Sequence, residues 1–134
     1  WYEIARLDHR FERGLDNISA TYTGRPDGGI DVLNRGYDRA KGEWREAQGK
    51  ARFVGPRDRA MLEVSFFGPF YGGYNVVDLD PDYQLALVVG PSRDYLWVLS
   101  RRPDPPREAV ERVVRRAAEL GFDTSALIFV QHDR

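Results

Sequence analysis

Short runs of alternating apolar and polar residues, separated by turn residues, dominate the chain. Alternation with a period of two is typical of strands that bury one face. The pattern predicts strands at 1–7, 17–23, 30–37, 43–54, 60–67, 74–79, 83–89 and 95–101. Gly, Pro, Asn and Asp gather between these runs, and the Asp-Gly within 24–29 is a strong hairpin signal. The chain is therefore expected to be all-β, with about eight strands in an up-and-down antiparallel sheet.

Near the C-terminus the alternation gives way to helical spacing. The apolar positions that repeat in this way are Val110, Val113, Val114, Ala117 and Ala118. We expect a helix over about 105–120, with Asp104 as its N-cap, Pro105 at its first position and Gly121 just past its end. A single apolar stripe predicts that this helix packs on the outside of the sheet, and residues 126–130 predict a final strand.

Closure of the sheet into a barrel would remove its exposed edges, and an eight-stranded barrel holds a side-chain core or one small ligand. Successive connections in such a barrel alternate between its two ends. This places loops 8–16, 37–43, 68–73 and 90–94 at one end, and turns 24–29, 55–58 and 80–82 at the other. The tight turns suggest a closed base, and the longer loops suggest an open rim. The expected shape is a cup.

The same topology brings Trp1, at the head of the first strand, beside Arg101, at the end of a late strand. A guanidinium stacks well on an aromatic ring and can cap backbone carbonyls. We therefore expect Trp1 and Arg101 to form a structural plug at the base, with no contact to a ligand.

One face of the strand at 43–54 carries small residues, which leave volume in the barrel. Trp97 shares the face of Arg101, because residues four apart in a strand point the same way. An apolar wall with a few tyrosine and asparagine groups is typical of small-molecule pockets. The candidate ligand-binding residues are Ala20, Tyr22, Asn34, Ala47, Gly49, Phe66, Tyr74, Tyr95 and Trp97. The alternative is that these side chains form an ordinary core.

Phe70 and Tyr71 lie between glycines in the predicted rim loop 68–73. Exposed aromatics there would contact a membrane, a partner chain or an entering lipid, or else would fold back as packing elements. Four arginines also border the predicted rim, where they would meet a carboxylate or phosphate head group or only solvent. These are Arg6, Arg13, Arg39 and Arg93.

Composition narrows the classes of function. A chain of 134 residues with 42% hydrophobic residues suits one domain, 1–134. The net charge of −1 and the lack of a basic run argue against nucleic-acid binding. The absence of cysteine excludes disulfides and Cys-based metal sites, and two distant histidines argue against a metal or cofactor. No catalytic motif or paired inner carboxylate can be placed, so we do not expect an enzyme.

The motifs in these strands resemble those of the lipocalin family, in particular its bacterial branch close to apolipoprotein D. Trp1 matches the tryptophan of the family's first motif, Asp80 to Tyr83 resemble the second with a departure at the threonine, and Arg101 matches the third. The segments W-Y-E-I-A-R-L-D-H-R-F-E-R-G, V-S-F-F-G-P-F-Y-G-G-Y and L-G-F-D-T-S extend the resemblance over the whole chain. Because the chain starts directly on a strand and lacks the glycine of the first motif, we expect a native start further upstream.

The resemblance implies an eight-stranded calyx that binds, stores or transports a hydrophobic ligand, with fatty acid or lysophospholipid favoured. It also implies the bacterial cell envelope, at the outer membrane or in the periplasm, because many members are outer-membrane lipoproteins. Membrane association and a homodimer stay open as further partners. Two alternatives also stay open: a membrane- or partner-docking module that uses the 68–73 loop, and a lipid-modifying enzyme on the same fold.

Overall fold

The computed structural model describes residues 1–8, 13–53, 61–67, 70–79, 84–90 and 95–133, and for residues 61–75 only the backbone is considered. Within these ranges the chain forms nine strands, one α-helix and a short 3-10 turn, η2 (Thr124–Ala126). The strands are β1 (Tyr2–Leu7), β2 (Leu15–Gly24), β3 (Ile30–Asp38), β4 (Glu43–Phe53), β5 (Met61–Phe67), β6 (Phe70–Leu79), β7 (Leu85–Val89), β8 (Leu96–Ser100) and β9 (Leu127–Phe129). The helix is α1 (Arg107–Glu119).

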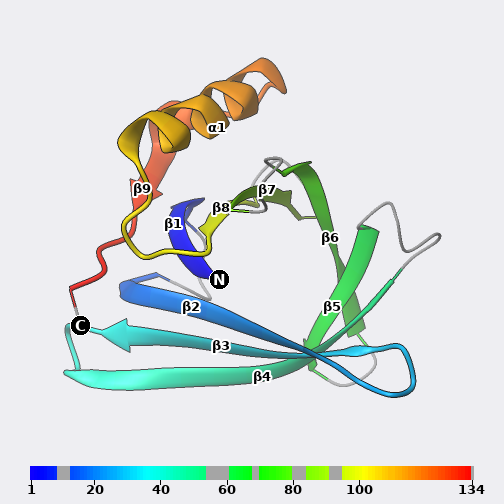
Figure 1. Cartoon of the computed structure of the whole chain (residues 1–134). Helices are drawn as coiled ribbons and strands as arrows, with labels where there is room; N and C mark the ends of the chain where they lie inside the picture. Colours follow the sequence, from blue (N-terminus) through cyan, green and yellow to red (C-terminus); the bar gives the residue numbers. More distant parts are fainter. Residues whose placement is uncertain (9–12, 54–60, 68–69, 80–83, 91–94, 134) are drawn as a thin grey trace.

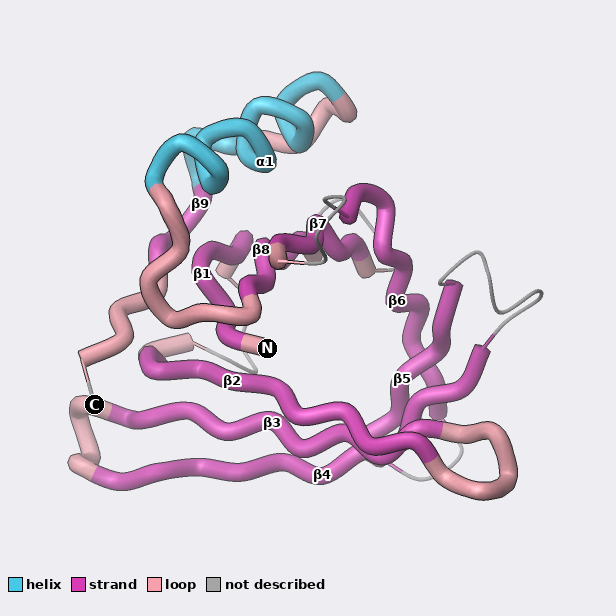
Figure 2. The backbone as a smooth tube through the Cα atoms, in the orientation of Figure 1, coloured by secondary structure: helices cyan, strands magenta, loops and turns pink. Residues whose placement is uncertain are grey.

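Strands β2 to β8 pair in sequence order, and each pair is antiparallel. β1 then pairs with β8 along one edge and with β2 at Tyr2 and Ser19 on the other. The sheet therefore curls round until β2, at one end of the strand order, meets β1 (Figures 1 and 2). This arrangement confirms the predicted all-β, up-and-down fold with one helix outside.

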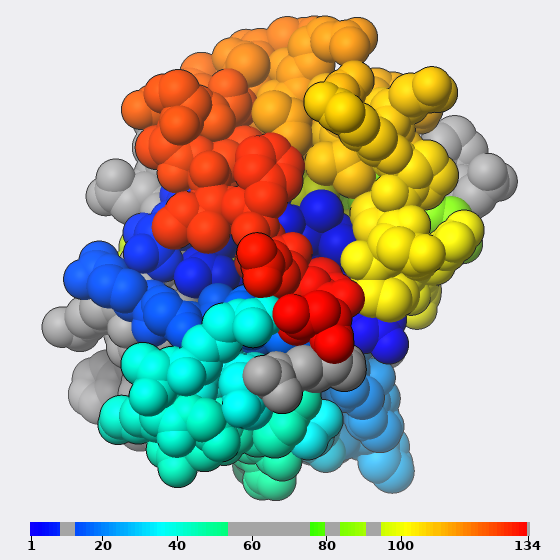
Figure 3. All heavy atoms as spheres, turned by 90° about the vertical axis from the view of Figure 1, so that its left-hand side faces the viewer, coloured from blue at the N-terminus to red at the C-terminus, as the bar shows by residue number. Residues whose placement is uncertain are grey.

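The contact between β1 and β2 is short, and the C-terminal segment, residues 130–133, continues the seam between them. Asn17 adopts a left-handed φ of 51°, and the β2–β3 register shifts between Asp16 and Ser19. Asparagine tolerates this conformation better than most residues. The Asn17 amide then donates to the Gln131 carbonyl at 2.8 Å, and the Val130 amide donates to the Ile4 carbonyl at 2.9 Å. In Figure 3 the C-terminal residues (red) lie between the first strands (blue) and the β3–β4 region (cyan).

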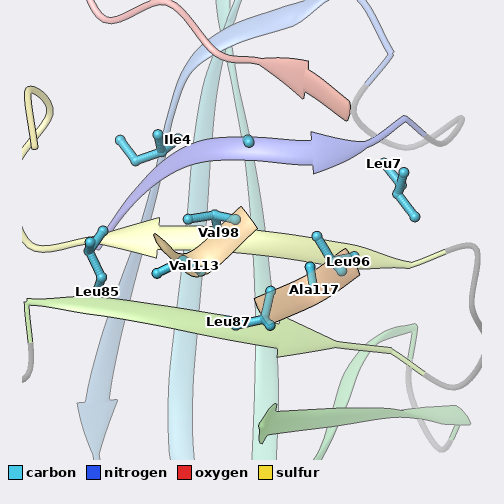
Figure 4. Close-up of a cluster of buried hydrophobic side chains, with 9 residues drawn as sticks. Ile4, Leu7, Leu85, Leu87, Leu96, Val98, Val113 and Ala117 are labelled. Atoms are coloured by element: carbon cyan, nitrogen blue, oxygen red, sulfur yellow. The ribbon is translucent and has the colours of Figure 1, made fainter. Parts of the chain in front are cut away.

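Helix α1 covers the outer face of β1, β7 and β8 (Figure 4). Val113 and Ala117 are buried, as the helical spacing predicted, and pack against the strands. The strand side chains of this cluster are Ile4, Ala5, Leu7, Leu85, Leu87, Leu96 and Val98. Full burial of a leucine or valine stabilises the fold by about 1.5–3 kcal/mol, so this cluster is a major source of stability. We call this the outer face and the opposite one the inner face.

The two ends of α1 compare differently with expectation. Pro106 precedes the first helical residue and no side chain caps the amides, so the predicted N-cap at Asp104 and start at Pro105 are wrong. At the other end Gly121 has a φ of 92°, its amide donates to the Ala118 carbonyl at 3.0 Å, and the Phe122 amide donates to the Ala117 carbonyl at 3.2 Å. These bonds form a Schellman motif, which confirms Gly121 as the residue that ends the helix.

One loop prediction is also wrong. The rim loop expected at 68–73 is shorter, because β5 ends at Phe67 and β6 begins at Phe70, and these two residues pair. Phe70 and Tyr71 therefore belong to a strand. Glycines at 72 and 73 suggested a loop, but strand pairing with β5 takes them into the sheet.

Candidate ligand site

The inner face can be followed from strand to strand through the register. Trp1 and Ala20 exchange two backbone hydrogen bonds of 2.7 Å, so their side chains lie on one face. Ala20 pairs with Asn34, and Asn34 pairs with Ala47. Trp1 and Trp97 both pack against a second buried cluster, which is separate from the one under α1. Trp1, Trp97, Ala20, Asn34 and Ala47 therefore share the inner face.

The β7 and β8 side of the inner face is well packed. Ala86, Val88 and Leu99 are buried there, and Trp97 lies against them half-buried. Tyr95 lies two residues nearer the rim, with its ring centroid 6.1 Å from that of Trp97. A Cβ at Gly90 would lie 2.6 Å from the Tyr95 Cβ, so glycine makes room for this ring. Two aromatic rings thus line this wall.

The β2–β4 side of the inner face is more open. Tyr22 pairs with Val32 and Val32 with Gly49, which adds Tyr22 and Gly49 to this wall. Along β4 the exposure falls toward the base: Ala47 is exposed, Gly49 is half-buried and Ala51 is only 1% exposed. Ala47 and Gly49 contribute little side-chain volume to this wall, and its exposure decreases toward the base. This gradient is the strongest structural sign of a cup.

At the base, the Arg101 guanidinium carbon lies 4.1 Å from the centre of the Trp1 ring. Trp1 and Arg101 are therefore neighbours, as the up-and-down topology predicted. The Arg101 amide also donates a hydrogen bond to the Gln84 carbonyl at 2.9 Å. A stacked pair of this kind contributes about 0.5–1 kcal/mol when it is exposed. That the two residues act as a structural plug stays a prediction.

The remaining candidate residues lie where only the backbone is considered. Phe66 belongs to β5, and Tyr74 pairs with Leu62 across β5 and β6. The side chains of Phe66, Phe70, Tyr71 and Tyr74 fall outside the described residues. Their expected contact with a ligand, membrane or partner stays a prediction, as does ligand contact by the other candidates.

Sequence reasoning missed a buried ion pair on the inner face. Arg6 is 2% exposed and Glu3 is 3% exposed, and Arg6 Nη1 lies 3.1 Å from Glu3 Oε2. Arg6 pairs with Trp97 and Glu3 with Leu99 in the β1–β8 register, which shifts between Glu3 and Ala5. That bulge places both charged residues on one face. Arg6 also donates to Asp8 at 3.1 Å and to the Leu15 carbonyl at 3.4 Å.

These contacts correct the expectation for Arg6, one of the four arginines placed at the predicted rim. Arg6 is enclosed and saturated by protein groups, so it does not meet a head group. Arg39 binds Asp16 and donates to Asp133 at 2.7 Å, and Arg13 lies 3.4 Å from Asp8. Arg93 lies outside the described residues.

Arg39 joins the β3–β4 turn to the C-terminal segment across the seam. It also donates to Gln131 at 3.2 Å, while Asn17 donates to Asp133 at 3.1 Å. His132 Nε2 lies 2.7 Å from the Glu3 carbonyl, and its ring meets that of Tyr2 edge-on. Hydrogen bonds from Arg39 and then Asn17 lower the pKa of Asp133 from its ordinary value of 3.8 to about 2. The same contacts with Asp133 and Asp16 raise the pKa of Arg39.

Acid should weaken the clamp that Arg39 and Asn17 form with Asp133 across the seam. Because the pKa of Asp133 is lower in the folded protein, its stabilising effect is full above about pH 4 and is lost as the pH falls toward about 2. Urea unfolding midpoints measured between pH 5 and pH 2, roughly that window, should fall less steeply in Asp133→Asn than in the parent chain. An equal slope in both proteins would mean that the clamp does not contribute to acid sensitivity.

The outer wall carries a separate groove of about 760 Å³ between α1 and β9. Its apolar lining includes Ile4, Val110, Val114, Ala118, Phe129 and Val130. Asp104, Arg107, Glu111 and Arg115 also line it, so an acyl chain there would lie among charged groups. It is on the helix side of the sheet, away from the inner face, and we do not assign the ligand to it.

Two further observations concern membranes and metals. No helix in the described part of the chain is both long and apolar enough to cross a membrane. Among the side chains that the structure describes, no group of three His, Asp or Glu residues could hold a metal ion.

Comparisons with known proteins agree with this geometry. A family model described as a lipocalin-like domain matches residues 1–132. The outer membrane lipoprotein Blc of Escherichia coli K12 is 56% identical over 131 residues, covering 98% of this chain and 74% of that protein. Apolipoprotein D of Macaca fascicularis is 33% identical over 123 residues, covering 83% and 61%. The chain belongs to the lipocalin family.

A solved structure supports the same fold. Lobster apocrustacyanin A1 superposes with a TM-score of 0.77 at 15% identity, covering 100% of this chain and 76% of that one. The Blc proteins of Escherichia coli and Vibrio cholerae, 56% and 55% identical, are outer membrane lipoproteins, which bears out the expected cell-envelope location. Family membership also supports binding of a small hydrophobic ligand.

Proposed function

We propose that this lipocalin binds, stores or carries one fatty acid or lysophospholipid, with the acyl chain inside the cup. The observation that carries the proposal is the inner face of β2–β4, where exposure falls from Ala47 to Ala51 and small residues leave room beside the packed wall of Trp97. The mechanism is equilibrium binding. An acyl chain exchanges water for contacts with the wall, worth about 0.8 kcal/mol per methylene, until the space is filled.

We favour binding over catalysis for a physical reason. Three described carboxylates lie on the inner face, Glu3, Asp38 and Glu43. Glu3 is paired with Arg6 and enclosed, and Asp38 accepts a hydrogen bond from the Lys41 amide at the end of its strand. A general acid or base must reach the substrate within hydrogen-bond distance, and a second group must complement it. A lipid-modifying activity therefore lacks support from the described side chains. Docking through Phe70 and Tyr71 stays an alternative, and liposome binding by a Phe70→Ser, Tyr71→Ser variant would test it.

Titration of delipidated protein with a C18 lysophospholipid tests the proposal, with tryptophan fluorescence as the signal. We expect saturable binding at about one ligand per chain, since a cup of this kind holds one small ligand. The signal should come mainly from Trp97, because Trp44 lies on the outer face and Trp1 is covered by Arg101. Trp97→Phe should still bind, with a smaller change in fluorescence.

Absence of saturation with both lysophospholipid and a C18 fatty acid would contradict the proposal. A change of equal size in the parent chain and in Trp97→Phe would place the ligand away from this wall. Trp44→Phe is the matched control, because it removes an outer-face tryptophan and should leave the signal intact.

A further inference from the structure

The described arginines of β1, the following loop and the β3–β4 turn already bind protein carboxylates. Arg6 is held by Glu3 and Asp8, Arg13 lies against Asp8, and Arg39 binds Asp16 and Asp133. A bound anion would have to displace these partners. Among the described residues, a cation without such a partner is better placed to meet a head group, and the register of β3 and β4 identifies one.

Arg45 lies on the inner face, two residues nearer the rim than Ala47. It pairs with Gly36, just as Ala47 pairs with Asn34, so the two pairs point to the same side of the sheet. The side chains that alternate with them form a cluster on the outer face. There Arg35 lies 3.9 Å from the centre of the Trp44 ring, and Tyr37 packs edge-on against Trp44.

The surroundings of Arg45 leave it available. It is exposed, and among the described residues it has no hydrogen bond or ion pair. Its pairing partner on β3 is Gly36, so no β3 side chain lies directly opposite it. A Cβ on that glycine would lie 3.2 Å from Leu15 and 3.3 Å from Ile18, so these two apolar side chains occupy the space beside it. Asp38 and Glu43 share the inner face at the strand ends, but Asp38 accepts a bond from the Lys41 amide at 3.2 Å.

We propose that Arg45 binds the anionic head group of the ligand at the rim, while the acyl chain runs down past Ala47 and Gly49. This inference rests on the proposed function and adds a specificity to it: a carboxylate or phosphate next to the chain. Arginine matches both groups, because its fork donates two parallel hydrogen bonds. The site selects for a negative charge near the rim.

The test compares ligands of one chain length that differ in the head group: oleic acid, oleoyl lysophosphatidic acid and oleyl alcohol. Affinities are measured by calorimetry for the parent chain, Arg45→Ala and Arg45→Lys. Arg45→Ala should weaken both anions about tenfold, or about 1.4 kcal/mol, and leave the alcohol unchanged. Arg45→Lys should recover part of the loss. Lys50→Ala, which removes a cation from the outer face of β4, is the matched control.

These measurements distinguish failure of the Arg45 proposal from failure of the proposed function. Unchanged binding of both anions by Arg45→Ala would overturn the role of Arg45 and leave the proposed function intact. An equal loss for the alcohol would also overturn it, because the effect would then be on the cup and not on the head group. If the parent chain binds none of the three, the proposed function fails and the inference fails with it. Loss for only one anion identifies that head group as the one Arg45 selects.

Discussion

Replacing Glu3 with alanine should lower the free energy of unfolding by about 3 kcal/mol, the range found when one partner of a buried ion pair is removed. Glu3 and Arg6 are 3% and 2% exposed, and their charged atoms lie 3.1 Å apart. Without the carboxylate, the Arg6 guanidinium stays buried with one charge partner fewer. Asp8 still accepts its Nε bond, which limits the loss.

The double variant Glu3→Leu, Arg6→Met is the informative control. Apolar residues of similar volume often replace a buried ion pair at little cost, so the double variant should recover most of the stability lost in Glu3→Ala. The free energy of unfolding of the parent chain and the two variants is measured in urea at about pH 7, where folded proteins tend to be most stable. Equal stability of Glu3→Ala and the parent chain would mean that water reaches Arg6 and that the inner face is wetter at β1 than the burial indicates.

The pair was hard to predict because a bulge breaks the alternation of β1. With regular alternation, Glu3 and Arg6 would lie on opposite faces, and Arg6 would point away from the barrel. The register shift between Glu3 and Ala5 turns Arg6 toward the interior instead. No turn residue marks this position in the sequence, so only the neighbouring strand reveals it.

The strands, by contrast, could be predicted from the sequence. Apolar and polar residues alternate through β2, β3 and β4, and the hairpin turns fix the register of these strands. The pairs Ala20 with Asn34 and Asn34 with Ala47 place the predicted lining residues of these strands on one face. Arg45 carries the same signal, two residues before Ala47. The sequence pattern instead favours the arginines beside the predicted loops, because the rim of a barrel is made of loops.

The contacts of the C-terminal segment could not be predicted. Arg39 and Asp133 are 94 residues apart, and neither belongs to a motif that would pair them. Their meeting depends on where β9 runs along β1 and where Asn17 turns β2 away. Local pattern decides which residues form strands, but long-range pairing of this kind follows from the path of the whole chain.

Filling the cup should abolish tight binding. Ala47 is exposed on the inner face, so Ala47→Trp would place an indole where the acyl chain is proposed to lie without displacing a buried neighbour. If the indole excludes about four methylenes, the affinity for a C18 ligand falls by about 3 kcal/mol, on the order of a hundredfold. Gln48→Trp puts the same group one residue further on, on the opposite face of β4, where it should have no effect.

Calorimetric titration of these two variants with a C18 lysophospholipid tests the central claim, that the ligand lies inside the cup against the inner face of β2–β4. We expect Ala47→Trp to lose binding on the order of a hundredfold while its unfolding midpoint stays close to that of the parent chain, and Gln48→Trp to bind like the parent. Equal affinities in both variants would contradict the claim and place the lipid elsewhere on the molecule.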